Sequence, residues 1–263
     1  MTHGGFRNGE TLDARRAALA AARELGIMFV AVIAYFAIRG FTEGAYDDAL
    51  ANAQRVVDLE QLLHIHIEEE LQDVILGSHA LVTLANWVYI WGHWPFIAAV
   101  AAWLVISHPA EYRAIRNAFL VSGSIGLVIF ATFPVAPPRL FDPTLVDTVT
   151  EHSRAYRVLQ PPALVNQYAA MPSFHFGWNV LIGLGIVRCS ERRWAKAAGV
   201  AAPAAMGLAT VLTANHYLLD LAAGAAIALA ALYAVELARG RRFAPWEMRA
   251  WVRPLERVPA DAA

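Results

Sequence analysis

Among its 263 residues the chain has a single cysteine, Cys189, and a single lysine, Lys196. One cysteine excludes an internal disulfide bond and any metal site built from several thiolates. Charged residues make up only 16% of the chain, against roughly 25% in an average soluble domain. The formal net charge is −1, so the chain lacks the basic excess that is typical of nucleic-acid-binding proteins, and no nucleic acid partner is predicted.

Apolar residues, by contrast, make up 58% of the chain and occur in long blocks. A helix that crosses a bilayer needs about 17–25 mostly apolar residues. Segments that reach or approach this length are 25–40, 86–107, 115–133, 173–188, 194–214 and 216–237. We therefore predict an all-α polytopic membrane protein with six transmembrane helices in a lipid bilayer. Its parts are an N-terminal segment (1–24), a six-helix membrane domain (25–238) and a basic C-terminal tail (239–263).

The basic residues predict the orientation of these spans. With the N-terminus inside, 16 of the 21 basic residues fall on the cytoplasmic side. The other five are Arg39, Arg55, Arg139, Arg154 and Arg157. The positive-inside rule favours this arrangement, so both termini are predicted to be cytoplasmic. A polar, arginine-containing lead precedes the first apolar block, and no cleavable signal peptide is expected.

Two long loops then lie outside. In the first, residues 41–85, apolar residues recur near helical spacing with acidic residues between them; they are Leu50, Val57, Leu59, Leu63, Ile67, Leu71 and Ile75. This pattern predicts one or two amphipathic surface helices in the first outer loop, lying on the membrane. The second loop, residues 134–172, is proline-rich and irregular, which is typical of segments that carry functional groups.

Unusual polar residues occur at the outer ends of three predicted spans. The segment MPSFH (171–175) begins the fourth span, NHYLLD (215–220) begins the sixth, and Arg139 follows the third. His216 and Asp220 are four residues apart and therefore share one helix face. A carboxylate beside an imidazole fixes its tautomer and supports the positive charge that develops when the other nitrogen attacks.

The same end of the molecule offers groups that favour a phosphate. Ser173 stands at a helix start, where free backbone N–H groups and the helix dipole attract an anion. Arg139 adds a charged donor that can bind the anion through two hydrogen bonds. This combination predicts phosphoryl transfer in which His216 attacks phosphorus, Asp220 orients it, and His175 acts as general acid and then base. The scheme requires no metal and no cofactor.

Each of these residues also has a purely structural interpretation when it is taken singly. A histidine at a span boundary can be an interfacial polar residue, and a Pro-Ser pair is ordinary helix capping. A metal site that includes His64 and His66 is conceivable, because imidazole suits zinc. Two residues apart on a helix, they point to different faces, so no metal site is predicted. His93, with Tyr89 one turn before it, is a better candidate to support the site, because buried polar groups are costly in a membrane.

Segments 171–175 and 215–220 resemble the type 2 phosphatidic acid phosphatase/haloperoxidase superfamily. Within it, the similarity is greater to the inositol phosphorylceramide synthase branch and its bacterial relatives. That branch has Pro-Ser-x-His where the phosphatases have Pro-Ser-Gly-His, and it has Asn-His-Tyr before the downstream aspartate. Residues 165–170 and 136–139 also resemble this branch, and the resemblance covers roughly residues 89–224.

The resemblance implies a metal-independent phosphotransferase or phosphatase of membrane lipids, with a phosphohistidine intermediate and an outward-facing site in a bacterial inner membrane. It assigns His216 as the nucleophile, Asp220 as its orienting partner and His175 as the leaving-group acid. The predicted phosphate-binding residues are Arg139, Ser173 and Phe174. Predicted supporting residues are Asn215, Tyr168, Tyr89 and His93.

Two cations of the phosphatase pattern are absent. The phosphatase lysine seven residues before the first arginine is replaced by Thr132, and the arginine six residues before the nucleophile is replaced by Thr210. Fewer cations favour a singly charged phosphodiester over a monoester, although Arg154 or Arg157 would restore the deficit. We therefore predict head-group transfer at the outer leaflet. The alternatives are hydrolysis of a lipid phosphate or isoprenoid diphosphate, and a non-catalytic lipid-binding scaffold.

Overall fold

The computed structural model describes residues 46–152 and 167–241, together with seven residues between 23 and 33. Most of the predicted first span (25–40), most of the segments 1–24 and 239–263, and Arg154 and Arg157 lie outside these ranges. Within the described ranges the regular structure is helical and contains no strand, apart from one isolated parallel bridge between Val135 and Ala169.

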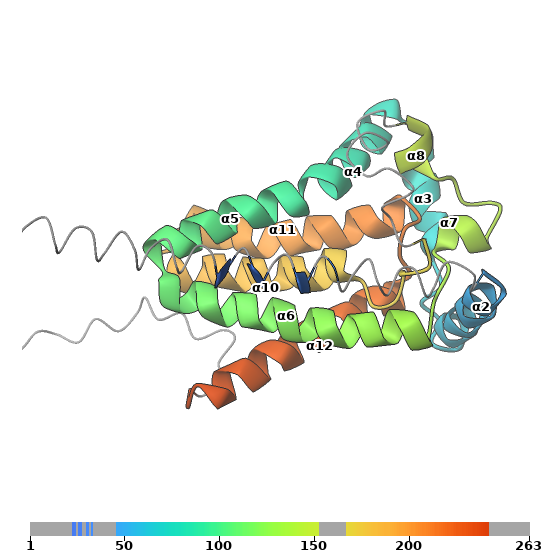
Figure 1. Ribbon diagram of the computed structural model, residues 1–263. Coiled ribbons are helices and arrows are strands. Elements are labelled where there is room, and N and C mark those ends of the chain that lie inside the picture. The colour runs from blue at the N-terminus through green and yellow to red at the C-terminus, as the bar shows by residue number, and fades with distance from the viewer. Residues whose placement is uncertain are drawn as a thin grey trace, which may run out of the picture.

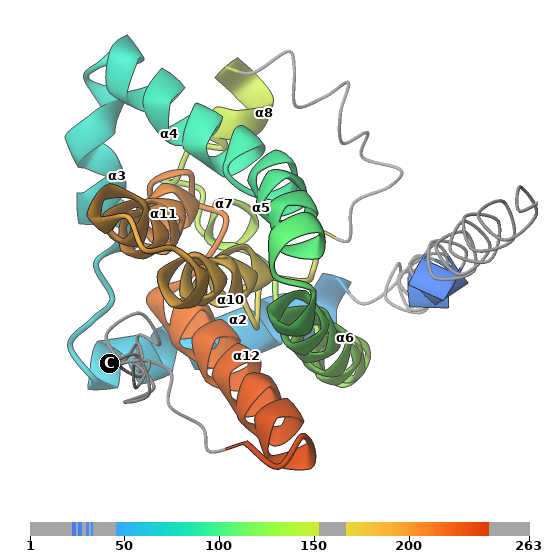
Figure 2. The same ribbon diagram turned by 90° about the vertical axis from the view of Figure 1, so that its left-hand side faces the viewer.

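The longer helices run side by side and form a bundle (Figure 1). They are α4 (His79–Trp91), α5 (Trp94–Ser107), α6 (Pro109–Thr132), α10 (Phe174–Cys189), α11 (Arg193–Leu212) and α12 (Leu218–Ala238). Seen along the bundle, α10 is central (Figure 2), and it contacts α5, α6, α11 and α12. Within residues 46–152 and 167–241, the other four helices gather at one end of the bundle. They are α2 (Tyr46–Leu62), α3 (Glu68–Leu76), α7 (Pro138–Phe141) and α8 (Thr148–His152).

Glycines allow α10 and α12 to approach each other backbone to backbone. A Cβ atom added at Gly177 would overlap the carbonyl oxygen of Gly224, and one added at Gly224 would overlap the carbonyl oxygen of Ser173. Only glycine lacks the atom that would collide. The start of α10 is therefore held directly against the first turns of α12.

The described helices are those of a membrane protein. Three of them, α6, α11 and α12, are long and apolar enough to span a bilayer, and α4 with α5 makes a fourth candidate. The sequence predicted one span at 86–107, whereas the structure has two helices bent by 44°. The break follows Gly92, and Pro95 lies in the first turn of α5, where its missing N–H is tolerated. Helix α10, with 16 residues, is shorter than a full span.

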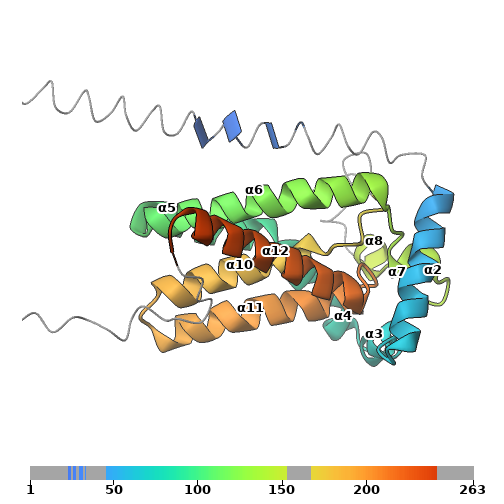
Figure 3. The same ribbon diagram turned by 90° about the horizontal axis from the view of Figure 1, so that it is seen from below.

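The first predicted outer loop contains α2 and α3. Helix α2 lies across the end of the bundle (Figure 3). Its buried face includes Ala49, Ala53 and Val57, which join a cluster around Tyr217. Leu59 is 46% exposed, so small residues, rather than all the larger apolar ones of the sequence pattern, form the packed face of this helix.

Candidate active site

The predicted catalytic residues meet at the end of the bundle that α2, α3 and α7 cover. His175 lies in the first turn of α10, Asp220 lies in the first turn of α12, and His216 lies in the turn between α11 and α12. That turn begins at Ala214, whose φ of 53° reverses the chain. The Asn215 side chain donates to the carbonyl oxygen of Thr213 (3.1 Å) and thereby stabilises this turn.

His216 is held in one tautomer. Its side chain is buried, and Nδ1 lies 2.8 Å from the carbonyl oxygen of Ala170 and 3.3 Å from Oδ2 of Asp220. A carbonyl oxygen only accepts, so Nδ1 carries the proton and Nε2 keeps its lone pair. The sequence predicted Asp220 as the orienting partner, but Ala170 is the nearer acceptor. No residue type signals this contact, because it is made by a main-chain carbonyl.

A short parallel contact holds the Ala170 carbonyl in place. Val135 donates its N–H to the carbonyl oxygen of Tyr168 (2.9 Å) and accepts from the N–H of Ala170 (3.2 Å). Tyr168, which the sequence predicts to support the site, contributes its main-chain carbonyl to this contact. Its ring lies 6.2 Å from that of Tyr46, in the cluster under α2.

The surroundings of His216 favour its neutral imidazole. Burial lowers the pKa of His216 to about 3, and the positive charge of Arg139 acts in the same direction. Nε2 faces Nδ1 of His175 at 3.4 Å. Because Nε2 has no proton, the proton between the two rings belongs to His175 Nδ1. The lone pair of His216 Nε2 and the proton of His175 Nδ1 therefore face each other.

Asp220 connects the two helix starts. Its Oδ2 accepts from the N–H of Tyr217 (2.9 Å), and its main-chain carbonyl accepts from the N–H of Ser173 (2.9 Å). The carboxylate is fully buried, and its Oδ1 has no hydrogen-bond partner among the described residues. Asp220 thus caps α12 while its carboxylate lies beside the His216 ring.

The His175 ring contacts two of the predicted supporting residues, stacked on Tyr89 and tilted against His93. Its ring centroid is 4.6 Å from that of Tyr89 and 4.3 Å from that of His93. Asn179 donates to the His175 carbonyl oxygen (2.8 Å) and lies 3.4 Å from Nδ1 of His93. The sequence analysis missed Asn179, although a buried amide one turn after His175 is a usable signal for a supporting residue.

The start of α10 offers main-chain donors. Ser173 is fully buried, and its hydroxyl accepts from the N–H of Phe176 at 3.4 Å, as a helix cap does. The amides of Phe174 and His175, in the first turn, have no intrahelical acceptor. The Phe174 ring packs against Phe130 and Trp178, so the main chain of Phe174 is the part that is available to an anion.

Arg139 lies in α7 and belongs to the same end. Its N–H donates to the carbonyl oxygen of Ala214 (3.0 Å), in the turn that carries His216. Its Nε donates to Oδ2 of Asp147 (3.1 Å), a partner that the sequence did not predict. The two Nη nitrogens have no hydrogen-bond partner in the part of the chain that the structure describes. They remain as donors for an anion.

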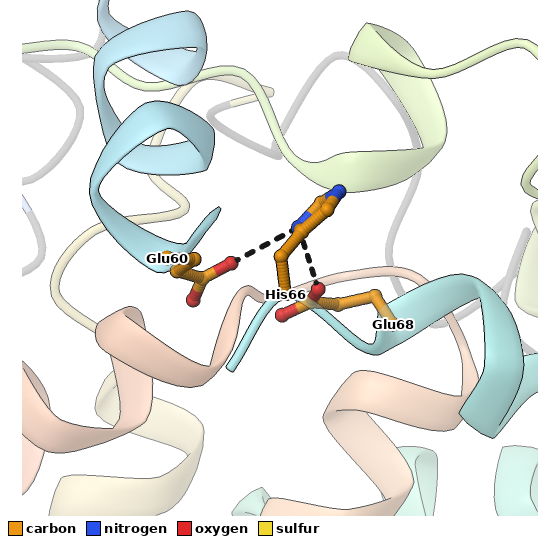
Figure 4. A group of neighbouring side chains, drawn as sticks. All are labelled: Glu60, His66 and Glu68. Carbon is orange, nitrogen blue, oxygen red and sulfur yellow. Dashed lines mark hydrogen bonds and ion pairs between the residues drawn. The ribbon is translucent and has the colours of Figure 1, made fainter. Parts of the chain in front are cut away.

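Three other side chains are placed as metal ligands would be, namely Glu60, His66 and Glu68 (Figure 4). The sequence predicts no metal site here, because helical spacing would point His64 and His66 to different faces. In the structure both lie in the turn between α2 and α3, and His64 has a φ of 57°. The two glutamates were missed, since each was read as part of a polar helix face.

A family model described as the PAP2 superfamily matches residues 54–234. This range is more than half of the 263-residue chain, and it includes both histidines, Asp220, Ser173 and Arg139. No curated protein and no solved structure gives a significant match to the chain.

Proposed function

The chain belongs to the PAP2 superfamily, and we propose that it is a membrane enzyme that transfers a group between lipid phosphate esters through a phosphohistidine. The observation that carries this proposal is the pair of facing ring nitrogens. Nε2 of His216 has a lone pair because Nδ1 is engaged with Ala170, and Nδ1 of His175 faces it at 3.4 Å with a proton.

In the first half of the reaction, Nε2 of His216 attacks phosphorus and the bond from phosphorus to the leaving oxygen breaks. For this step His175 carries a second proton, taken up together with the anionic substrate. The imidazolium gives its Nδ1 proton to that oxygen and becomes a neutral ring, so the leaving group departs as an alcohol. The Nδ1 proton stays on His216 and points at the Ala170 carbonyl and the Asp220 carboxylate, which stabilise the positive ring. Substrate binding must separate the two rings, because phosphorus occupies the space between them.

In the second half, His175 removes the proton of an incoming hydroxyl, whose oxygen attacks phosphorus. The bond from phosphorus to Nε2 breaks, and His216 returns to its neutral form. Arg139 and the first amides of α10 hold the phosphoryl oxygens during both steps. The acceptor is an alcohol for transfer and water for hydrolysis, so the outcome depends on which one the site admits.

Two threonines, at positions where the phosphatases have cations, support a phosphodiester substrate, and with it transfer or phosphodiesterase chemistry, over hydrolysis of a monoester. The Thr210 hydroxyl is buried and donates to the carbonyl oxygen of Gly207 (2.7 Å). The Thr132 hydroxyl donates to the carbonyl oxygen of Val128 (2.9 Å), in its own helix. Neither side chain supplies charge to a phosphate. A site with fewer cations suits a phosphodiester better than a doubly charged monoester.

We further propose that the site faces the extracytoplasmic side of a bacterial inner membrane, because 16 of 21 basic residues fall on the other side of the predicted spans. The substrate is then a lipid of the outer leaflet, which reaches the site between helices. The chemistry described above uses no metal at phosphorus.

The proposal is tested by phosphorus NMR on the purified protein with a mixture of phosphatidic acid and phosphodiester lipids. We expect a new phosphodiester resonance to grow at the expense of an old one. His216→Ala removes the nucleophile and should abolish the change, whereas His79→Ala, an exposed histidine at the same end, should not. Acid-labile phosphate bound to the wild-type protein alone identifies the phosphohistidine.

Other outcomes would select other functions. Orthophosphate from the wild type alone would show hydrolysis, and the reasoning from the two threonines would then be wrong. A product that forms equally with His216→Ala would exclude the phosphohistidine scheme. No change with any lipid of the mixture, and no bound phosphate, would support the non-catalytic scaffold.

A further inference from the structure

Glu60 and Glu68 are two glutamates buried side by side beneath the start of α12. Glu60 is in the last turn of α2 and is 0% exposed, and Glu68 begins α3 and is 1% exposed. Each uses one oxygen to cap α12. Oε1 of Glu60 accepts from the N–H of Leu219 (2.8 Å), and Oε1 of Glu68 accepts from the N–H of Leu218 (3.0 Å).

The second oxygen of each glutamate is directed at the same histidine nitrogen. Oε2 of Glu68 lies 3.0 Å from Nδ1 of His66, and Oε2 of Glu60 lies 3.4 Å from it (Figure 4). The three ligand atoms lie within 4.8 Å of one another. Tetrahedral ligands at about 2.0–2.2 Å from a zinc ion are roughly 3.3–3.6 Å apart, so these separations are close to those of a bound metal.

We propose that Glu60, His66 and Glu68 bind a divalent transition-metal ion, and that Zn²⁺ fits the three ligands best. Two ionised carboxylates and a neutral imidazole give a bound divalent ion no net charge. Imidazole suits zinc, and carboxylate accompanies it in many zinc sites, whereas Mg²⁺ prefers oxygen ligands alone.

Without a cation, one buried oxygen of this group is left unsatisfied. His66 Nδ1 supplies one proton at most, although two carboxylate oxygens face it. Oε2 of Glu68 is buried without a hydrogen bond among the described residues. Buried carboxylates are costly unless they are paired or bind a metal. Burial, and to a smaller extent the adjacent charge of Glu68, raise the pKa of Glu60 to about 7.

A water-accessible side remains for a further ligand. The His66 side chain is 31% exposed, so the ion can enter from solvent and complete its coordination with water. His66 is also in a turn rather than a helix, and the turn is therefore able to adjust to the ion. Three protein ligands with one water is a known zinc arrangement.

The ion would position the catalytic turn without touching the substrate. Its two glutamates hold the amides of Leu218 and Leu219, which lie between His216 and Asp220 in the chain. Fixing the glutamates therefore fixes the first turn of α12. The proposal is independent of the proposed phosphoryl transfer, because metal binding is measured directly and does not require activity.

The test uses the full-length protein, purified in detergent with a tag that contains no histidine. Metal content is measured by mass spectrometry, and melting is followed after chelation and after addition of Zn²⁺ or Mg²⁺ alone. We expect about one zinc per chain, and a melting temperature that falls on chelation and is restored by Zn²⁺ but not by Mg²⁺.

Three variants make the result specific. Glu68→Gln and Glu60→Gln keep an oxygen for the α12 amides but remove the charge, and His66→Ala removes the nitrogen. Each should weaken zinc binding by at least about 100-fold, since even the loss of an outer partner costs 10–100-fold. Glu69→Gln and His79→Ala change exposed residues nearby and should bind zinc as the wild type does.

The proposal is overturned if the wild type neither contains nor is stabilised by zinc, or if Glu60→Gln and Glu68→Gln bind it as tightly as Glu69→Gln does. A zinc ion that acts on phosphorus would eliminate all activity in His66→Ala, as in His216→Ala. The positioning ion proposed here predicts a slower but measurable rate for His66→Ala below its melting temperature.

Discussion

The two helices that begin at the site, α10 and α12, have first turns with opposite surroundings. At α12, the carboxylates of Asp220, Glu68 and Glu60 accept hydrogen bonds from the first backbone amides. At α10, the side-chain acceptor that the structure describes is the neutral hydroxyl of Ser173. Both starts carry the same partial positive charge of a helix dipole, but only one of them is already neutralised.

This difference assigns opposite roles to the two starts. A phosphate gains little from α12, whose amides are occupied and whose neighbours are anions. It gains more from α10, whose open amides lie beside Arg139. The excess of carboxylates at α12 instead attracts a cation, as proposed for Glu60, His66 and Glu68. His216 lies between the two starts, so its ring receives an anionic substrate on one side and rests on a rigid, capped helix on the other.

Ser173→Asp places a carboxylate at the start of α10, as at the start of α12, and it should lower the activity more than any other variant described below. An aspartate caps a helix as well as a serine does, but Ser173 is fully buried, so the added carboxylate also lowers the melting temperature. Activity is therefore compared well below the melting temperature of the variant. The added charge repels the phosphate and occupies its donors, and we expect kcat/KM to fall by at least ~10³-fold. Ser173→Ala, which adds no charge, should lose less than about tenfold.

These two variants are compared by steady-state kinetics and by melting of the same detergent preparations. Equal activity of Ser173→Asp and Ser173→Ala would show that the phosphate does not bind at the start of α10.

Arg139→Ala removes the cation that distinguishes the open start, and it should have the next largest effect. We expect kcat/KM to fall by ~10²–10³-fold, as for the loss of one donor to a developing charge. Arg139→Lys keeps the charge but not the paired donors and should recover part of the rate. Arg55→Ala, at an exposed arginine of α2, is the matched control. A rate for Arg139→Ala within threefold of the wild type would exclude a role in phosphate binding.

The sequence predicted those parts of the site that depend on local spacing. His216 and Asp220 lie on one face because they are four residues apart, and the tight turn at Asn215 follows from the single residue that separates the predicted spans 194–214 and 216–237. Contacts between distant segments were not predictable. His216 reaches Ala170 across 46 residues, and Glu60 reaches Leu219 across 159. Such pairs depend on how whole helices pack, and residue types alone do not encode that packing.

Gly224→Ala tests the close contact that places the two starts side by side. Its Cβ would overlap the Ser173 carbonyl oxygen, so α10 and α12 must move apart. We expect a loss of about 1–3 kcal/mol of stability, together with a lower kcat. Gly77→Ala is the control, because a Cβ there meets nothing within 4 Å and the backbone φ of −71° suits alanine. Equal melting temperatures for the two variants would contradict the tight approach of α10 and α12.

The smallest expected effect is that of pH on the reaction of His216, whose ring lies between the starts of α10 and α12. Burial lowers the pKa of His216, so the neutral, nucleophilic form persists as the pH falls through the ordinary imidazole value of about 6.5. The single-turnover rate of histidine phosphorylation by a phosphodiester should therefore fall less than about twofold between pH 8 and pH 6. If His216 had the ordinary imidazole pKa, the rate would fall to roughly a quarter of its value over this range. A phosphodiester keeps its single charge throughout, so a steep acid limb would mean that His216 is protonated more easily than its burial implies.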